Sequence, residues 1–181
     1  MKKKKCNYMV KVKSNIKYPS AELMQTACYE DYRRCLETYD KIYEKTNIAL
    51  AFCGAVLVVF LSNIDFEMIN KMKDTQGHEL FFQHIELICV LVSTGLIVWS
   101  VVQLLLLMRS QTIYVFDSIA ARNEEIYNLQ PNEAALWLID NYTFATNEQR
   151  EINNNKHEQY NSAIVKIVLS LLLYAITCFI K

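Results

Sequence analysis

The stretch that decides the fold is Ile85–Met108, which reads IELICVLVSTGLIVWSVVQLLLLM. It carries no charge between Glu86 and Arg109. At about 1.5 Å of rise per residue, a helix of this length crosses the roughly 30 Å hydrocarbon core of a bilayer. A segment in hydrocarbon must satisfy its own backbone hydrogen bonds, which favours a helix. The stretch therefore predicts a membrane protein.

Two other apolar stretches resemble the first. Ala163–Ile180 carries one charge, Lys166, near its start, and predicts a further crossing. Ile48–Leu61 is interrupted only by small residues and is at the low end of spanning length. It fits a short span, a tilted span extended by flanking residues, or a re-entrant segment. We therefore predict an all-α membrane protein with about three transmembrane helices and helical cytoplasmic extensions.

Positive charge is concentrated near the N-terminus, where the first 45 residues hold 11 of the 19 lysines and arginines. The net charge of the chain is zero, and the loop after the first apolar stretch carries more carboxylates than lysines. By the bias of lysine and arginine toward the inside, the N-terminus is expected in the cytoplasm and this loop outside. The run Lys2–Lys5 fits a tail that contacts anionic lipid and equally a solvated tail.

This pattern divides the chain into four parts. Residues 1–46 form a basic cytoplasmic segment with an amphipathic helix, and 47–108 form two transmembrane helices with a short outer loop. Residues 109–162 form a helical cytoplasmic segment, and 163–181 form the C-terminal transmembrane helix. Pro19-Ser20-Ala21-Glu22 predicts the start of the first helix, because serine caps helices and glutamate suits the first turn. No glycine or proline follows before the first apolar stretch, so one helix is expected to continue into it.

The cytoplasmic parts give further expectations. A helical stripe is expected from Ile113, and Pro131 ends it. A second helix follows, and Thr146-Asn147-Glu148-Gln149 has the form of a capping box, which predicts the start of a third. In the N-terminal helix, Tyr32 and Tyr39 share a stripe that is expected to pack on other cytoplasmic helices; docking of a partner protein is the alternative.

The sequence offers no signal for a metal or a cofactor. The six cysteines show no paired short spacing, so we predict neither a disulfide framework nor a metal site. The chain has only three glycines and no glycine-rich phosphate loop.

Polar residues recur along the two strongest spans at helical intervals. Because polar groups are costly in lipid, they are expected to face protein or water. They either line a pore or hold helices together, since serine, threonine and glutamine bond between membrane helices. A pore needs more helices than one copy supplies, so it requires a ring of copies. The candidate lining residues are Glu86, Ser93, Ser100, Gln103, Lys166, Ser170, Tyr174 and Thr177.

Arg150 and His157 form a second pattern, because six residues separate them. This spacing occurs in HEPN-type ribonucleases, in which histidine transfers a proton and arginine steadies the phosphate. Between them, Asn153, Asn154 and Asn155 either contact the phosphate of RNA or solvate a helix face. Two residues at a loose spacing also arise by chance.

The basic helical N-terminus, the few spans, the helical cytoplasmic part and the Arg150/His157 pair together resemble the small transmembrane accessory protein of type VI-B CRISPR systems. More loosely, the chain is similar to SLATT-type antiphage membrane effectors. The resemblance implies a defence effector in the inner membrane of a bacterium, with an RNA-guided effector or RNA as its activator. It also implies that Arg150 and His157 are structural or regulatory.

Three hypotheses follow. The preferred one is a homo-oligomeric pore that depolarises or permeabilises the inner membrane, which makes the protein a channel rather than an enzyme. The first alternative is a membrane-tethered HEPN-like ribonuclease that uses Arg150 and His157. The second is a membrane anchor or scaffold that recruits a soluble partner through the Tyr32/Tyr39 stripe.

Overall fold

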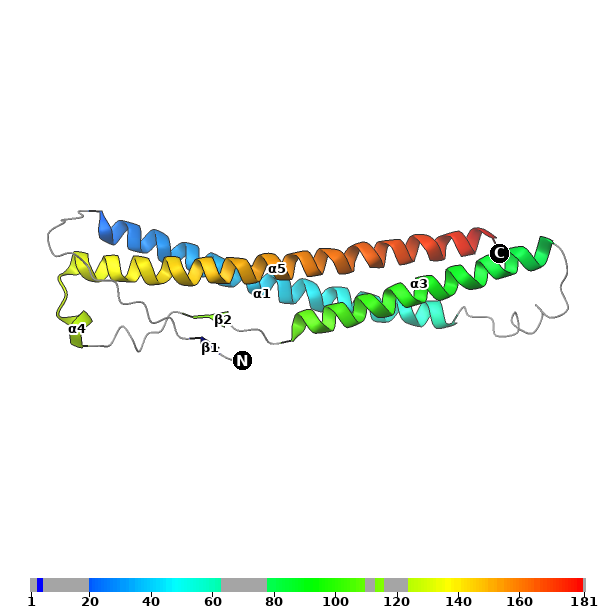
Figure 1. Ribbon diagram of the computed structural model, residues 1–181, viewed down its shortest axis with the longest axis horizontal. Coiled ribbons are helices and arrows are strands. Elements are labelled where there is room, and N and C mark those ends of the chain that lie inside the picture. Colours follow the sequence, from blue (N-terminus) through cyan, green and yellow to red (C-terminus); the bar gives the residue numbers. More distant parts are fainter. Residues whose placement is uncertain (1–2, 5–19, 63–77, 110–112, 116–123, 181) are drawn as a thin grey trace. The chain divides into compact units, whose positions relative to one another are not determined.

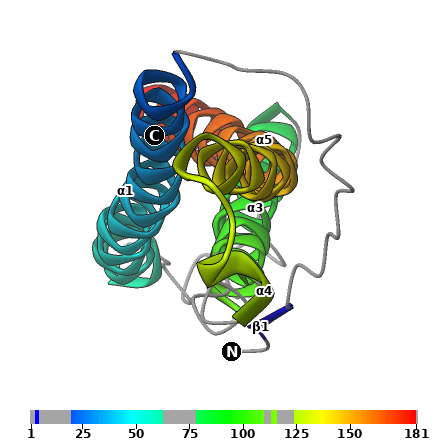
Figure 2. The same ribbon diagram turned by 90° about the vertical axis from the view of Figure 1, so that its left-hand side faces the viewer.

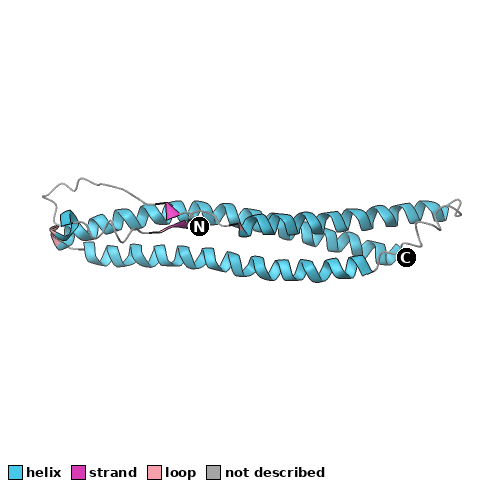
Figure 3. Ribbon diagram, turned by 90° about the horizontal axis from the view of Figure 1, so that it is seen from below, coloured by secondary structure: helices cyan, strands magenta, loops and turns pink. Residues whose placement is uncertain are grey.

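The computed structural model describes residues 3–4, 20–62, 78–109, 113–115 and 124–180. Nearly all of these residues are helical, which confirms the all-α class (Figure 3). The three long helices are α1 (Ala21–Ser62), α3 (His78–Met108) and α5 (Pro131–Ile180). The short elements are α4 (Glu124–Tyr127) and the two-residue strands β1 (Lys3–Lys4) and β2 (Ile113–Tyr114) (Figure 1).

The three long helices are each long and apolar enough to cross a membrane. This confirms the expectation of three helices of membrane-spanning length. As predicted, α1 begins beside Ser20 and continues without a break through Ile48–Leu61. A continuous helix with further residues on its N-terminal side is the form that a short or tilted span takes. The expected outer loop falls on residues 63–77, which lie outside the described part of the chain.

The chain divides into two compact units. Unit 1 comprises Met1–Ile42 and Ser110–Lys156, and unit 2 comprises Tyr43–Arg109 and His157–Lys181. Helices α1 and α5 contribute residues to both units. Unit 2 contains the three apolar stretches, whereas unit 1 contains most of the charged residues. The predicted membrane boundaries after residues 46, 108 and 162 are not tested by this division and stay predictions.

In unit 2, α1, α3 and α5 lie side by side (Figures 1 and 2). Their buried residues recur at alternating intervals of three and four, the pattern of helices packed at a shallow angle. The outward faces carry large exposed apolar side chains such as Phe52, Val98 and Leu172. An apolar exterior of this kind suits hydrocarbon rather than water. The buried core consists of Ala49, Cys53, Phe60, Ile97, Leu104, Ala163 and Ile167.

In unit 1, α1 and α5 lie side by side and bury the tyrosine stripe between them. Tyr32 and Tyr39 are only 6% and 5% exposed. The Tyr32 ring lies 5.7 Å from that of Tyr142 on α5. The expected packing of this stripe is therefore confirmed, and little of either ring is left at the surface for a docking partner.

The expectation of a helix from Ile113 is wrong at its first residues. Ile113 and Tyr114 form β2, which pairs in parallel with β1. The backbone of Tyr114 has partners on both long helices of unit 1. Its N–H donates to Gln149 Oε1 at 3.2 Å, and its carbonyl accepts from the Tyr32 hydroxyl at 3.2 Å. These side chains satisfy the groups that a helix would have paired along its own axis.

The predicted boundary at the capping box is also wrong, because α5 runs unbroken from Pro131 to Ile180. Proline favours the first position of a helix, where its missing N–H costs nothing. No glycine or proline follows within α5, so nothing local stops the helix. Thr146 and Gln149 are buried inside it and make tertiary contacts instead of capping a new N-terminus.

Candidate functional site

Part of the polar stripes predicted on the second and third spans meets between α3 and α5. The Ser170 hydroxyl donates to the Ser93 carbonyl at 2.7 Å, and the Ser100 hydroxyl lies 3.4 Å from the Ala163 carbonyl. Ser93, Ser100 and Ser170 are completely buried. We call these three residues the serine seam. These two contacts also show that α3 and α5 are antiparallel, because the residue number rises from 93 to 100 on α3 while it falls from 170 to 163 on α5.

The hydroxyls of the serine seam on α3 also have partners on their own helix. Ser93 Oγ donates to the Val90 carbonyl at 3.0 Å, and Ser100 Oγ donates to the Leu96 carbonyl at 2.9 Å. A serine that bonds its own helix backbone carries its hydrogen-bond partner with it. Separation of α3 from α5 would therefore leave these two donors satisfied.

Beyond Ser100, the contact between α3 and α5 becomes strongly polar. Gln103 Nε2 donates to the Gln159 carbonyl at 3.0 Å, and its Oε1 accepts from the Lys166 ammonium at 2.5 Å. The same ammonium donates to Ser162 Oγ at 3.1 Å, one turn earlier on α5. Lys166 thus bends back toward the polar part of its helix, as lysines do near the ends of membrane spans.

The remaining lining candidates have different surroundings. Glu86 is half-buried on α3. The Tyr174 ring stacks on Phe60 with 4.0 Å between centroids. Thr177 is buried and donates to the Tyr174 carbonyl at 2.6 Å. The structure thus brings Ser93, Ser100 and Ser170 together in the serine seam and places Gln103 with Lys166 at one end of it.

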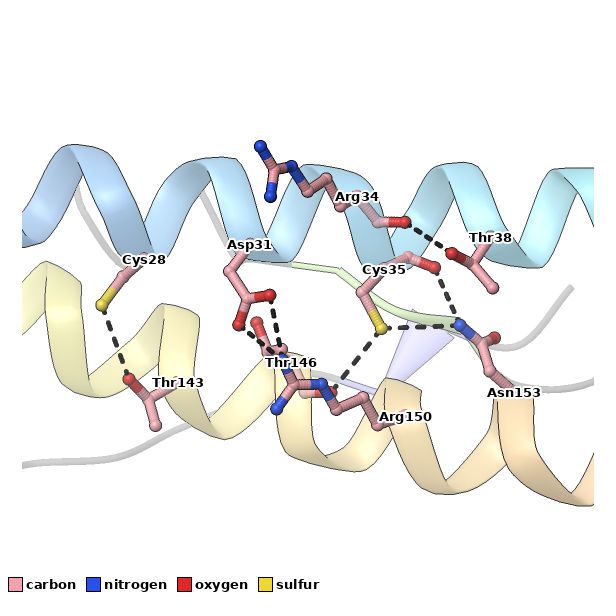
Figure 4. A network of polar contacts seen from close by, with 9 residues as sticks. All are labelled: Cys28, Asp31, Arg34, Cys35, Thr38, Thr143, Thr146, Arg150 and Asn153. Carbon is pink, nitrogen blue, oxygen red and sulfur yellow. Dashed lines mark hydrogen bonds and ion pairs between the residues drawn. The ribbon is translucent and has the colours of Figure 1, made fainter.

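Unit 1 contains a second polar cluster, built around Asn153 (Figure 4). Its amide Nδ2 donates to the Cys35 carbonyl at 2.8 Å and lies 3.5 Å from the Cys35 sulfur. Its Oδ1 accepts from Gln149 Nε2 at 3.1 Å. Asn153 is 5% exposed. Its amide therefore joins α5 to α1, whereas Asn154 and Asn155 are exposed. Contact of these two with RNA stays a prediction.

Arg150 is held by a carboxylate of α1. Its Nη2 lies 2.9 Å from Asp31 Oδ1 and 2.8 Å from Oδ2, and both side chains are about half exposed (Figure 4). These contacts use one terminal nitrogen of the guanidinium, so Asp31 would compete with a phosphate for the charge of Arg150. His157 is exposed on the part of α5 that belongs to unit 2. A catalytic use of the two residues stays a prediction from their spacing.

Cys35 lies beside this ion pair and is not arranged as a nucleophile. Burial raises the pKa of its thiol; Arg150 opposes the rise and Asp31 adds to it. Its Sγ contacts the Thr146 carbonyl at 3.8 Å. A thiol with a raised pKa is less reactive, because the thiolate is the attacking species. The described residues contain no group of three or more histidines, cysteines or carboxylates that could hold a metal.

Sequence reasoning missed the residues that fix unit 1, although a signal was present. Gln149, Asn153 and Lys156 recur at intervals of four and three, which is the rhythm of the buried positions of α5. Lys156 is fully buried, with its ammonium 4.4 Å from the centre of the Tyr39 ring. From the sequence, Gln149 is expected in a capping box, and Asn153 either contacts a phosphate or solvates a helix face. The same spacing of three and four residues continues to the buried apolar positions Ala163 and Ile167 of α5, and this continuity is the signal that the three polar residues are buried.

Comparisons with models of protein families, with curated proteins and with solved structures find no match to this chain.

Proposed function

We propose that this chain is a membrane effector that assembles into a ring of copies and forms a regulated pore, with unit 2 in the bilayer and unit 1 as its control element. The observation that carries the proposal is the serine seam, a buried row of hydroxyls between two helices whose outward faces are apolar. A single three-helix bundle has no room for an aqueous channel. The conduit must therefore lie between copies.

The seam supports a closed resting state and a simple route to opening. In the closed state, the hydroxyls of α3 and α5 face each other within one copy. In the open state, α3 and α5 part and the same hydroxyls face a water-filled conduit. The cost of exposing Ser93 and Ser100 to water is small, since each hydroxyl is already bonded to its own helix.

The helices shared by both units support control by unit 1. Both α1 and α5 contribute to unit 1 and to unit 2, so a ligand that changes the packing of these helices in unit 1 acts on helices that also form the bundle. Such a ligand opens the pore only if it binds the open arrangement more tightly than the closed one. From the resemblance, we propose an RNA-guided effector or RNA as this activator. The proposed location is the bacterial inner membrane, with the N-terminus in the cytoplasm and a role in antiviral defence.

The proposal is tested by a crosslink that holds α3 and α5 together at the serine seam. The variant Ser93→Cys/Ser170→Cys places two thiols at positions that contact each other across α3 and α5. After reconstitution into liposomes, we expect a short, reducible bifunctional thiol reagent to remove most of the ion flux. A reducing agent should restore it. The single variant Ser93→Cys keeps every native cysteine and is the matched control, whose flux should not respond.

Two results would refute the proposal. Unchanged flux in the fully crosslinked double variant would mean that α3 and α5 do not part during conduction. Absence of flux in the wild-type protein, reconstituted at several protein-to-lipid ratios and with candidate RNA, would dispose of the pore itself. Crosslinks between two copies appear as dimers on a denaturing gel, which distinguishes them from the intended crosslink between α3 and α5 of one copy.

A further inference from the structure

The end of the α3–α5 contact that carries Gln103 has the features of a membrane–water boundary. Trp99 is 65% exposed there, and tryptophan is enriched at this level of membrane proteins. At the other end of α3, Phe81 and Phe82 are exposed and their rings meet edge to face. The 18 residues from Phe82 to Trp99 span about 26 Å of helix, close to the thickness of a hydrocarbon core.

Lys166 brings a positive charge to this boundary, and the partners of its ammonium in the described part of the chain are neutral side chains. Its ammonium donates to Gln103 Oε1 and to Ser162 Oγ, and an ammonium has three N–H groups. Within the described ranges, no carboxylate lies at ion-pair distance from it. The side chain is half-buried rather than fully solvated. The ammonium therefore has one remaining N–H donor and no carboxylate partner among the described residues.

Trp99 stands next to this charge and offers a second donor. Its ring centroid lies 6.0 Å from the Lys166 ammonium, although the two residues belong to different helices. The indole N–H is a donor without acceptor capacity. An anion that accepts from the ammonium of α5 would therefore lie beside the exposed indole of α3, which has an N–H to donate.

We propose that Lys166 and Trp99 bind the phosphate of an anionic phospholipid headgroup. A phosphate is the anion that a bilayer presents at this depth, and charge-assisted bonds from an ammonium to phosphate are strong. A zwitterionic lipid carries its own cation beside the phosphate, so the single lysine favours the anionic lipid. The inference rests on the membrane crossing proposed above, but it does not depend on ion conduction.

Lipid retention tests the site directly. The purified protein is equilibrated with equal amounts of phosphatidylglycerol and phosphatidylcholine in detergent, and the lipids that remain bound are counted by native mass spectrometry. We expect the wild type to prefer phosphatidylglycerol. Lys166→Gln should lower that preference by about fivefold, the usual weight of one lysine at an anionic membrane surface. Lys166→Arg should keep it, and so should Lys41→Gln, which removes an exposed lysine of unit 1.

A second experiment measures the depth of Trp99 in the bilayer. It needs no substitution at Lys166, so it remains informative even if the Lys166 variants misfold. Trp137→Phe leaves Trp99 as the only tryptophan, because the chain has two. We expect lipids brominated near the headgroup to quench its fluorescence more than lipids brominated at the chain ends. Stronger quenching by the deep bromine, or an unchanged lipid preference in folded Lys166→Gln, would overturn the site while leaving the pore proposal intact. Absence of quenching by either lipid would overturn the membrane crossing itself.

Discussion

Units 1 and 2 use the same helix packing with opposite surroundings. In both units, the buried residues of α1 and α5 recur at alternating intervals of three and four. In unit 1 this buried face holds large polar and aromatic groups such as Tyr39, Asn153 and Lys156, and charged residues cover the outside. In unit 2 the buried face is mainly apolar, from Ala49 and Ala163 to Phe60 and Ile167, and its polar members are small hydroxyl residues such as Ser170; apolar side chains also cover the outside.

The difference is the one expected if unit 1 lies in water and unit 2 in lipid, as proposed above. In water, burial of apolar surface drives helices together, so a polar group inside the packing must have specific partners. In lipid that driving force is absent, and close packing with a few interhelical hydrogen bonds takes its place. Unit 1 should therefore depend on a few essential polar bonds, whereas unit 2 should depend on many weak ones. The following predictions test this contrast, from the largest expected effect to the smallest.

The largest effect is expected from Asn153→Leu in unit 1. The change removes the amide that bonds the Cys35 carbonyl and leaves the buried Gln149 Nε2 without its acceptor. A buried polar group left without a partner costs about 1–3 kcal/mol. We expect faster amide hydrogen exchange in unit 1, measured by mass spectrometry, with little change in unit 2.

Asn154→Leu is the matched control for this prediction. The residue is next in sequence, has the same side chain and is exposed. Its replacement should leave exchange in both units almost unchanged. Equal effects of the two substitutions would mean that Asn153 does not join the helices of unit 1.

A smaller effect is expected from Ser170→Ala in the serine seam. The hydroxyl donates across the helices to the Ser93 carbonyl, and such bonds in membranes contribute about 0.6 kcal/mol on average. Ser93→Ala removes a hydroxyl that donates to its own helix, so its effect should be smaller still. Reversible unfolding in mixed micelles with increasing sodium dodecyl sulfate measures both. A loss in Ser170→Ala as large as that in Asn153→Leu would break the contrast between the units.

The Arg150–Asp31 pair should contribute little despite its two short contacts. Both side chains are about half exposed, and exposed ion pairs contribute about 0.2–1 kcal/mol. A double-mutant cycle with Arg150→Ala and Asp31→Ala should give a coupling in this range that shrinks as salt is added. A coupling that does not respond to salt would indicate that the pair is shielded from solvent.

The smallest effect concerns pH and Cys35. Burial raises the pKa of this thiol above its ordinary value of 9.0, so the folded protein holds the proton more tightly than the unfolded chain. The stability that results is fully present below pH 9 and is lost as the pH rises through the folded pKa. Cys35→Ala should make the decline of unit 1 stability above pH 9 less steep, measured by hydrogen exchange corrected for the intrinsic rate; the remaining decline is expected from Tyr142, whose pKa is also raised by burial. An equally steep decline in this variant would assign the dependence to another group.

The sequence was sufficient for the features that composition alone determines. The uncharged run Ile85–Met108 predicted a helix of membrane-spanning length, and the absence of glycine and proline between Ala21 and Ile48 predicted one helix that continues into the first apolar stretch. The sequence located the stripe of Ser93 and Ser100 but did not decide its role, because residues that pack helices together and residues that line a pore recur at the same spacing. The tertiary contacts of Ser170 place it against α3 within one copy.

The errors came from residues whose local signals were overridden by tertiary contacts. Thr146 and Gln149 have the spacing of a capping box, but helix propensity on both sides and burial against α1 and β2 keep α5 continuous. Tyr114 lies in β2 because groups from α1 and α5 bond its backbone. The partnership of Arg150 with Asp31 joins residues far apart in sequence, and no short motif records such a pair.

The most direct test of the closed-and-open account is the accessibility of a thiol at position 100. Ser100 is fully buried in the seam, so Ser100→Cys in the resting protein should resist a charged, membrane-impermeant thiol reagent. While the protein conducts in a planar bilayer, the same reagent should react and block the current, and the wild type should be unaffected. Rapid labelling at rest, or a current that the reagent never blocks, would contradict a seam that is closed at rest and lines the conduit when open.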